Sequence, residues 1–403
     1  MPFQKFTADN VFDGYRFLHD TVLIIADDGT IHDLVPAFEA GDGVRTFNGI
    51  ISPGFVNCHC HLELSHLEGM IPEKIGLVDF VFNVVTQRHS ADDMIQQAIE
   101  NAEDQMLHNG IVAVGDICNN TSTLQQKRKK RLCYHNFIEA TGWLPSVADV
   151  RFKQASAICH EFESGHAGVG NSIVPHAPYS VSEGLWEKLQ SSFAGKIVSI
   201  HNQEAACEDE FFLYGTGDFT RMYQLMNIDN THHVPTCKTS LQSYFHHLSG
   251  ADHAILVHNT FITEEDIVYV RRQTANRKSS APEVSQAPQT ASGKPEIFFC
   301  LCPNANIYIE NTLPHVEVLR KHNCSIVLGT DSLASNWSLS ILDEIKTLRR
   351  NFPQISSEEM LRWATSNGAE ALKMLDDLGT FEKGKTPGVI HISSDLSAAK
   401  RIL

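Results

Sequence analysis

Two histidines, His59 and His61, stand one residue apart at the end of the apolar stretch "GFVNCHCH". In a β-strand, side chains two residues apart lie on the same face, so the two imidazoles are expected to point at one place. Paired imidazoles are typical metal ligands, but a histidine at a strand end is often held by hydrogen bonds alone. A metal site therefore requires further ligands elsewhere in the chain.

Residues that could complete such a site follow other apolar stretches. His201 adds a third imidazole, and Asp331 adds a carboxylate. With the first two histidines they form a ligand set for one divalent ion such as zinc or iron, which needs three or four protein ligands and an open position. Glu204, three residues after His201, could move protons between a water and a leaving nitrogen. His258 could orient or deprotonate that water.

Eight short apolar stretches alternate with helical patterns along the middle of the chain. They are residues 54–61, 110–117, 131–140, 171–180, 196–204, 253–259, 296–304 and 324–332. They are continuously apolar rather than alternating, which is typical of strands buried on both faces of a parallel sheet. Helical patterns lie between them, for example at 92–109 and 183–193, and Thr263 is an expected N-cap. The pattern predicts an α/β fold with a (β/α)8 barrel.

Ionisable residues gather at the C-terminal ends of these stretches, where a barrel carries its active site. They are His59, His61, Asp116, Glu139, His176, His201, Glu204, His258 and Asp331. Other histidines lie outside the strand ends, so this concentration indicates a site but does not by itself establish one.

The two ends of the chain differ from its middle. Residues 1–50 contain a turn at 27–30 between two β-rich runs, and the C-terminal end is also turn-rich and strand-like. We predict a small β-sandwich domain built from 1–50 and 376–403, beside a barrel of residues 51–375. Residues 272–295 are rich in Ser, Ala, Pro and Gln, which predicts a low-complexity surface insertion rather than a lid.

Composition excludes several classes of protein. The net charge is −16, and no basic stripe is present to neutralise phosphates, which argues against nucleic acid or an anionic membrane as a partner. The N-terminus has no signal-peptide pattern, and no apolar run reaches transmembrane length. The ten cysteines show no disulfide framework, so a cytoplasmic protein with reduced thiols is expected.

Several motifs resemble, in order, the signatures of the amidohydrolase superfamily. They are "GFVNCHCHLE", "PHAPYS", "SIHNQE", "LVHNTFITEEDI", "CPNANIYI", "GTDSLASN" and "ATSNGAEAL". The most similar branch is that of the deaminases and chlorohydrolases, which includes guanine, S-adenosylhomocysteine and aminofutalosine deaminases. The resemblance runs from about residue 48 to residue 392. One departure is Ala305, which stands where the Cys-Pro-x-Ser-Asn motif has serine.

The resemblance implies a (β/α)8 barrel flanked by a small β-sandwich and assigns roles to single residues. It implies four metal ligands: His59, His61, His201 and Asp331. It implies that Glu204 is the proton shuttle and that His258 activates the water together with Asp331. His176 resembles the family residue that touches substrate from the fourth strand. That strand carries no lysine, unlike the strand in dinuclear members, which implies one divalent metal ion per chain, zinc or iron.

The implied reaction is hydrolytic deamination of an aminated N-heterocycle, nucleoside-like or nucleobase-like, with release of ammonia. Glu63 and Ser65 in the loop after the first strand are candidate substrate contacts. This loop, with "HLELS" and "GLVDFV", resembles that of aminofutalosine deaminases, which makes 6-aminodeoxyfutalosine a candidate substrate. The resemblance also leaves a homodimer open, because family members are often dimers.

Three alternatives compete with deamination. The same residues could hydrolyse a cyclic amide, an ester or a chloro-heterocycle. A catalytically inactive scaffold is disfavoured because all four ligand positions, Glu204 and His258 are present. A nucleotide-binding α/β protein is excluded because neither a Gly-x-Gly-x-x-Gly fingerprint after a strand nor a P-loop occurs.

Overall fold

The computed structural model describes residues 3–275 and 293–403. Eight parallel strands form its middle part, and each corresponds to one of the predicted apolar stretches. They are β6 (Phe55–Cys60), β7 (Ile111–Cys118), β8 (Cys133–Ala140), β9 (Gly170–Pro175), β10 (Ile197–Asn202), β11 (His253–His258), β12 (Glu296–Leu301) and β13 (Ser325–Leu328). Their side chains are almost all buried, which explains why the stretches are apolar without alternation.

These strands form two parallel ladders, β6-β7-β8-β9 and β10-β11-β12-β13, which close on each other. At one seam, the backbone amides of Thr330 and Asp331 both donate to the carbonyl of His59, each at 3.0 Å. At the other seam, the amide of His201 donates to the carbonyl of His176 at 3.0 Å. The two halves thus form a barrel, and both seams lie at residues that the sequence singled out.

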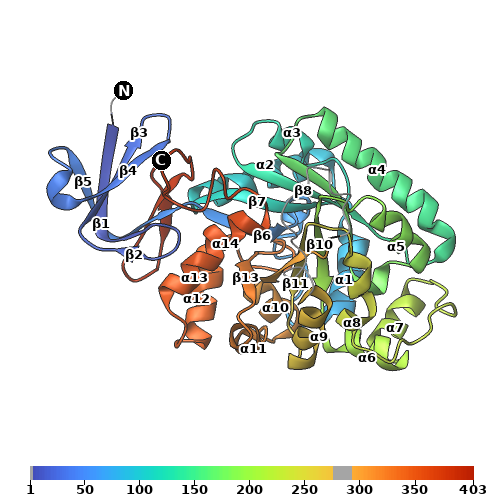
Figure 1. Ribbon diagram of the computed structural model, residues 1–403. Coiled ribbons are helices and arrows are strands. Elements are labelled where there is room, and N and C mark those ends of the chain that lie inside the picture. The colour runs from blue at the N-terminus through green and yellow to red at the C-terminus, as the bar shows by residue number, and fades with distance from the viewer. Residues whose placement is uncertain (1–2, 276–292) are drawn as a thin grey trace, which may run out of the picture.

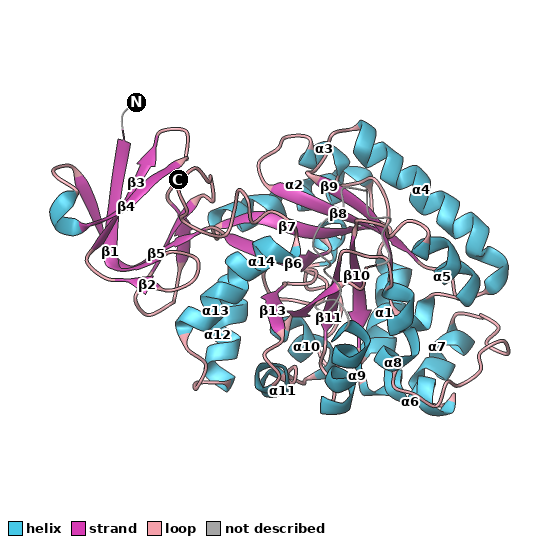
Figure 2. Cartoon of the chain, in the orientation of Figure 1, coloured by secondary structure: helices cyan, strands magenta, loops and turns pink. Residues whose placement is uncertain are grey.

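Helices surround the strands of the barrel (Figure 2). They are α1 (Leu77–Gln87), α2 (Asp92–His108), α3 (Leu124–Lys127), α4 (Ala148–Ser164), α5 (Glu183–Gln190), α6 (Ala206–Tyr214), α7 (Asp218–Leu225), α8 (Ser240–Tyr244), α9 (Glu264–Thr274), α10 (Pro303–Glu310), α11 (Val316–Lys321), α12 (Ile341–Asn351), α13 (Ser357–Ala364) and α14 (Ser366–Ala371). Short 3-10 helices are η1 (Ala37–Glu39), η2 (Leu62–Leu67), η3 (Pro145–Val147), η4 (Pro178–Ser180) and η5 (Phe245–Leu248).

The start of α9 shows how local sequence sets an element boundary. Thr263 accepts a hydrogen bond from the Asp266 amide, and the Asp266 side chain accepts one from the Thr263 amide. This reciprocal capping box satisfies two amides that the first helical turn leaves without partners. The predicted N-cap is therefore confirmed.

The two ends of the chain meet in one mixed sheet, drawn at the left of Figure 1. Its strands are β1 (Phe3–Phe12), β2 (Phe17–Leu18), β3 (Thr21–Ala26), β4 (Ile31–Pro36), β5 (Val44–Pro53), β14 (Val389–Ile392) and β15 (Ala399–Arg401). The order is β15-β14-β5-β1-β3-β4, with β2 paired to β1. β1 and β5 are parallel, whereas the other pairs are antiparallel.

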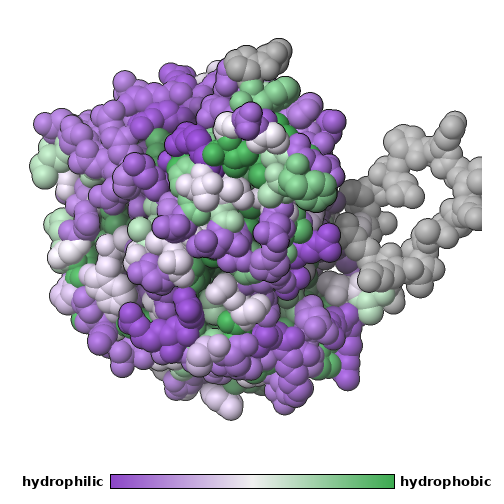
Figure 3. Space-filling view, turned by 90° about the vertical axis from the view of Figure 1, so that its left-hand side faces the viewer, coloured by the Kyte–Doolittle hydropathy of each residue, from purple (hydrophilic) through white to green (hydrophobic). Residues whose placement is uncertain are grey.

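This terminal sheet has a core of its own that includes Phe6, Leu23, Ile25 and Val389. The predicted turn at 27–30 joins β3 to β4. The face of the molecule on that side is mostly hydrophilic, with small hydrophobic groups scattered over it (Figure 3). β5 leads directly into β6, so the sheet holds one end of the strand that carries His59.

The predicted fold class, an α/β fold with a (β/α)8 barrel and a small β-sandwich built from both termini, is confirmed. The domain boundaries remain predictions. Most of the predicted insertion 272–295 lies outside the described residues, and its first three residues end α9. In the part of the chain that the structure describes, every helix is too short or too polar to cross a membrane.

Candidate active site

Three atoms from opposite sides of one barrel seam converge at the C-terminal end of the barrel. His59 Nε2 and His61 Nε2 lie 3.1 Å apart. Asp331 Oδ1 lies 3.4 Å from the first nitrogen and 3.2 Å from the second. A tetrahedral zinc ion with ligands at about 2.0–2.1 Å separates neighbouring ligand atoms by about 3.3 Å. The triangle therefore has the dimensions of one face of such a coordination sphere.

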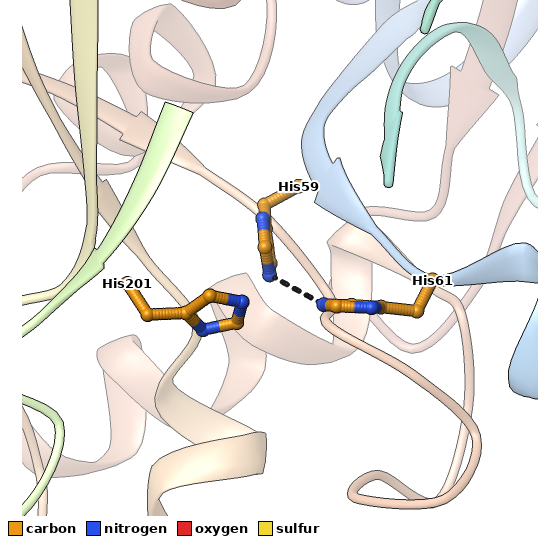
Figure 4. Close-up of side chains that lie close together, drawn as sticks. All are labelled: His59, His61 and His201. Atoms are coloured by element: carbon orange, nitrogen blue, oxygen red, sulfur yellow. Dashed lines mark hydrogen bonds between the residues drawn. The ribbon is translucent and has the colours of Figure 1, made fainter. Parts of the chain in front are cut away.

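His201 approaches this triangle from β10 (Figure 4). Ligand atoms of His59, His61 and His201 all lie within 4.8 Å of one another. His201 Nε2 is buried and has no hydrogen-bond partner among the described residues. A buried imidazole nitrogen without a partner is unfavourable unless something else binds it, and neutral imidazole is a common metal ligand.

The backbone around this cluster adopts uncommon conformations. His258 has φ 73°, Asp331 has φ 57° and Gln203 has φ 44°. Residues other than glycine rarely occupy this left-handed region, because the Cβ atom crowds the following carbonyl group. Such strain tends to collect at functional sites, where the surrounding structure enforces it. The three strained residues lie at or just after the ends of β10, β11 and β13.

Glu204 and His258 lie next to the cluster. Glu204 Oε2 is 3.7 Å from His201 Nδ1, and Glu204 Oε1 is 3.5 Å from His258 Nε2. Both side chains are buried, and burial raises the pKa of Glu204 and lowers the pKa of His258. Ser335 donates a 2.6 Å hydrogen bond to Asp331 Oδ2, which fixes the orientation of that carboxylate.

The electrostatics of the cluster favour a positive charge at its centre. Burial lowers the pKa of His201, but the carboxylates of Glu139 and Glu204 outweigh that effect and raise the pKa to about 10. Burial also raises the pKa of Asp331, yet the neighbouring histidines hold it well below its usual value. Imidazole nitrogens and carboxylates in such a field are the donor set of zinc or ferrous iron. The residues present therefore fit a divalent metal ion.

A cavity of about 970 Å³ opens above the cluster. What we term its metal end is formed by His61, His176, His201, Glu204 and Asp331. What we term its outer wall is formed by Leu77, Phe80, Val81, Val84, Arg88, Trp143, Val147, Arg151, Met222 and Tyr223. The cavity is larger than a nucleobase requires, and the outer wall is mostly apolar, which suits a substrate that extends beyond its reacting ring.

The candidate substrate contacts are placed differently from one another. His176 lines the metal end, and its Nδ1 lies 2.8 Å from the Ser180 hydroxyl. Glu63 lines the cavity and pairs with Arg88 at 3.3 Å. Ser65 does not line the cavity, because it is buried in η2 and its hydroxyl donates to the Leu62 carbonyl at 2.7 Å.

Some cavity residues were not assigned a role from the sequence. Glu139 was noted only as a strand-end residue, whereas Arg88 and Asn119 lie in segments without any motif. The nearby strand-end residue Asp116 lies outside the cavity lining and pairs with the buried Lys127 at 2.5 Å. A polar residue at a strand end therefore does not by itself mark a site, and only the three-dimensional arrangement separates the two cases.

Comparisons with known proteins agree with this geometry. The profile of the "Amidohydrolase family" matches residues 50–399 of the chain. The aminodeoxyfutalosine deaminase of a Nitratiruptor species is 24% identical over 385 residues, which cover 92% of this chain and 85% of that protein.

Solved structures share the fold at low sequence identity. The aminofutalosine deaminase of Helicobacter pylori, in complex with methylthio-coformycin, has a TM-score of 0.76 and 22% identity and covers 97% of this chain and 92% of that one. The zinc complex of atrazine chlorohydrolase from Arthrobacter aurescens TC1 has a TM-score of 0.71 and 16% identity, with coverages of 96% and 86%.

Proposed function

The chain belongs to the amidohydrolase family, within its deaminase and chlorohydrolase branch, and from this premise we propose that it deaminates an aminated N-heterocycle with a single bound metal ion. The chain is a hydrolase of the amidohydrolase and deaminase type, which acts on carbon–nitrogen bonds other than peptide bonds. The single observation that carries the proposal is the convergence of His59, His61 and Asp331 beside the carboxylate of Glu204.

Four residues would hold the metal ion. They are His59, His61, His201 and Asp331. A divalent cation, zinc or iron, would supply Lewis acidity that lowers the pKa of a bound water from about 15.7 towards 7. No lysine that could become carboxylated lines the described cavity, which supports one metal ion rather than two.

The protein groups around the metal ion would handle the protons and hold the reactants. Glu204 takes a proton from the attacking water and delivers it to a ring nitrogen of the heterocycle, as general acid–base catalysis requires. His258 and Asp331 hold the water by hydrogen bonds, and Ser335 fixes the Asp331 carboxylate for this task. Burial of these groups excludes bulk water and strengthens each electrostatic interaction.

The substrate is proposed to be nucleoside-like, with 6-aminodeoxyfutalosine as the first candidate. The curated aminodeoxyfutalosine deaminase matches most of the chain, and the loop around Glu63 resembles that of such enzymes. The size of the cavity and its apolar outer wall support a substrate larger than a free base.

A second candidate reaction is displacement of chloride from a chloro-heterocycle or hydrolysis of a cyclic amide. It remains a candidate because the chain shares its fold with atrazine chlorohydrolase. These reactions use the same water-activating residues and differ in the group that leaves the tetrahedral carbon, which is ammonia in deamination, chloride in dechlorination and the ring nitrogen in hydrolysis of a cyclic amide.

The deciding experiment is an ammonia-release screen on protein of measured metal content. The panel contains adenosine, S-adenosylhomocysteine, guanine, cytosine, pterins and 6-aminodeoxyfutalosine. We expect about one metal ion per chain and ammonia from one compound or a few closely related ones. One metal ion per chain with no ammonia from any compound would overturn the deaminase proposal and favour the second candidate. Absence of bound metal in active protein would overturn both.

A further inference from the structure

Glu139, near the end of β8, carries a carboxylate that the proposed reaction does not use. Its side chain is only 3% exposed, and Asn119 Nδ2 donates to its Oε2 at 3.0 Å. Glu139 Oε1 has no hydrogen-bond partner among the described residues, and Glu139 lines the cavity. Burying a carboxylate oxygen without a partner is unfavourable, so native proteins pair nearly all such atoms. A ligand that binds in the cavity could therefore donate a hydrogen bond to this oxygen.

Among the described residues, no side chain lies within hydrogen-bond distance of this oxygen. The cavity lining contains two arginines. Arg88 pairs with Glu63 rather than with Glu139, and Arg151 donates to the Gln154 side chain at 3.4 Å. His201 Nε2 lies 3.6 Å from Glu139 Oε1, which is beyond hydrogen-bond distance. In residues 3–275 and 293–403, no lysine or arginine forms an ion pair with Glu139.

Glu139 lies where the metal end of the cavity meets its outer wall. On one side it neighbours His201 of the metal end. On the other side, Asn119 links Glu139 to Glu63. The side-chain amide of Asn119 donates to Glu139, and its backbone amide donates to Glu63 Oε2 at 3.0 Å. Glu63 in turn pairs with Arg88 of the outer wall. A substrate whose ring reacts at the metal end would present its next chemical group to Glu139.

We propose that Glu139 is a specificity-determining residue that accepts a hydrogen bond from a sugar hydroxyl of a nucleoside substrate. The inference rests on the proposed function, because the sugar is the group attached directly to the reacting base. A buried acceptor that binds a substrate hydroxyl discriminates strongly against an analogue without that hydroxyl, because the acceptor is then left without a hydrogen bond. Glu139 would thereby select nucleosides over free bases and over their deoxy analogues.

Metal binding is the alternative role of Glu139. Ligand atoms of Glu139, His176 and His201 lie within 4.8 Å of one another. The substrate role is favoured because His201 already belongs to the set formed with His59 and His61. In addition, Asn119 already holds one oxygen of the Glu139 carboxylate. Metal analysis of a Glu139 variant separates the two roles.

The first test uses the metal-loaded wild-type protein alone. A nucleoside that it deaminates is compared with the 2′-deoxy and 3′-deoxy analogues of the same nucleoside. We expect at least one analogue to lose about 100-fold or more in kcat/KM. If both analogues react within about threefold of the parent, the inference is wrong, while the proposed deamination stands. If a free base releases ammonia but no nucleoside does, this inference is wrong, while the proposed deamination stands. If no compound of the panel releases ammonia, the deaminase proposal fails, and this inference fails with it.

The second test uses Glu139→Gln. We expect kcat/KM for the parent nucleoside to fall about 100-fold, with a much smaller fall for the sensitive deoxy analogue, so that the discrimination is lost. The control Glu100→Gln removes a half-buried carboxylate of α2 that pairs with Lys129 and does not line the cavity, and it should change neither value. Discrimination equal to that of the wild type would overturn the inference. Loss of the metal ion from Glu139→Gln would also overturn it, because the residue would then be a ligand.

Discussion

The metal end and the outer wall of the cavity are built differently. At the metal end, His59 and His201 belong to strands, and Asp331 follows a strand closely; backbone bonds across the two seams fix all three. On the outer wall, Arg88 follows the end of α1, and Trp143 lies in the loop after β8. From this difference we infer that the reaction and the choice of substrate are separable in this protein. The first depends on strand geometry, and the second on loops that can change without disturbing the barrel.

Asp331 at the metal end and Glu63 near the outer wall have pKa values that are shifted in opposite directions. Burial raises the pKa of Asp331, but the surrounding histidines outweigh it and keep the carboxylate ionised. Burial raises the pKa of Glu63 to about 7, and Arg88 only partly opposes that rise. When their environments give two carboxyl groups different pKa values, the two groups differ in protonation state and can serve different roles. Asp331 therefore stays ionised, whereas Glu63 changes its charge close to neutral pH.

The largest effect is expected from His201→Ala, which breaks the metal end. The variant should bind the metal ion far more weakly and lose about 10⁴-fold or more in kcat/KM, because three remaining ligands form an incomplete site. Metal analysis and the ammonia assay measure the two effects. The control His160→Ala alters an exposed residue of α4 and should behave like the wild type. An active His201→Ala variant with a full complement of metal would contradict the ligand assignment.

The next effect is expected from Glu204→Gln, which tests whether proton transfer is distinct from metal binding. Glutamine fills the same space but cannot carry a proton, so kcat should fall about 10²–10⁴-fold. The metal content should remain that of the wild type, because Glu204 is not among the proposed ligands. Undiminished turnover would remove its role as shuttle, and loss of metal would add it to the ligand set.

Much of the metal end could be predicted from the sequence, whereas little of the outer wall could. The spacing of His59 and His61 follows from the two-residue period of a strand, and buried parallel strands are visible as continuous apolar stretches. No comparable period governs Arg88 or Trp143, whose positions depend on how helices and loops pack. Ser65 shows the limit most clearly. Its place in a candidate loop suggested a contact, but its hydroxyl donates to a backbone carbonyl within that loop.

A smaller effect is expected from Arg88→Ala, which weakens the outer wall. Without the guanidinium, the pKa of Glu63 rises further, so less of its carboxylate is ionised at pH 7. We expect KM at pH 7 to rise about tenfold with kcat changed less than about threefold. The rise in KM should shrink towards pH 9, where Glu63 ionises again.

Steady-state kinetics between pH 6 and pH 9 check this prediction for Arg88→Ala, with Arg16→Ala as the control at a distant, exposed arginine. A fall in kcat at unchanged KM would mean that Arg88 acts on the reacting centre, and the proposed separation of the two regions would then fail.

The smallest effect is expected from Ala305→Ser, which restores the serine of the related motif. In the structure, Ala305 is fully buried in the first turn of α10 and does not line the cavity. A hydroxyl added there can donate to the carbonyl of Cys302, three residues earlier, which limits the cost of burying it. We therefore expect the Tm to change by about 5 °C or less and kcat/KM by about threefold or less. A tenfold change in KM at unchanged Tm would show that position 305 reaches the substrate, and the metal end would then extend to α10.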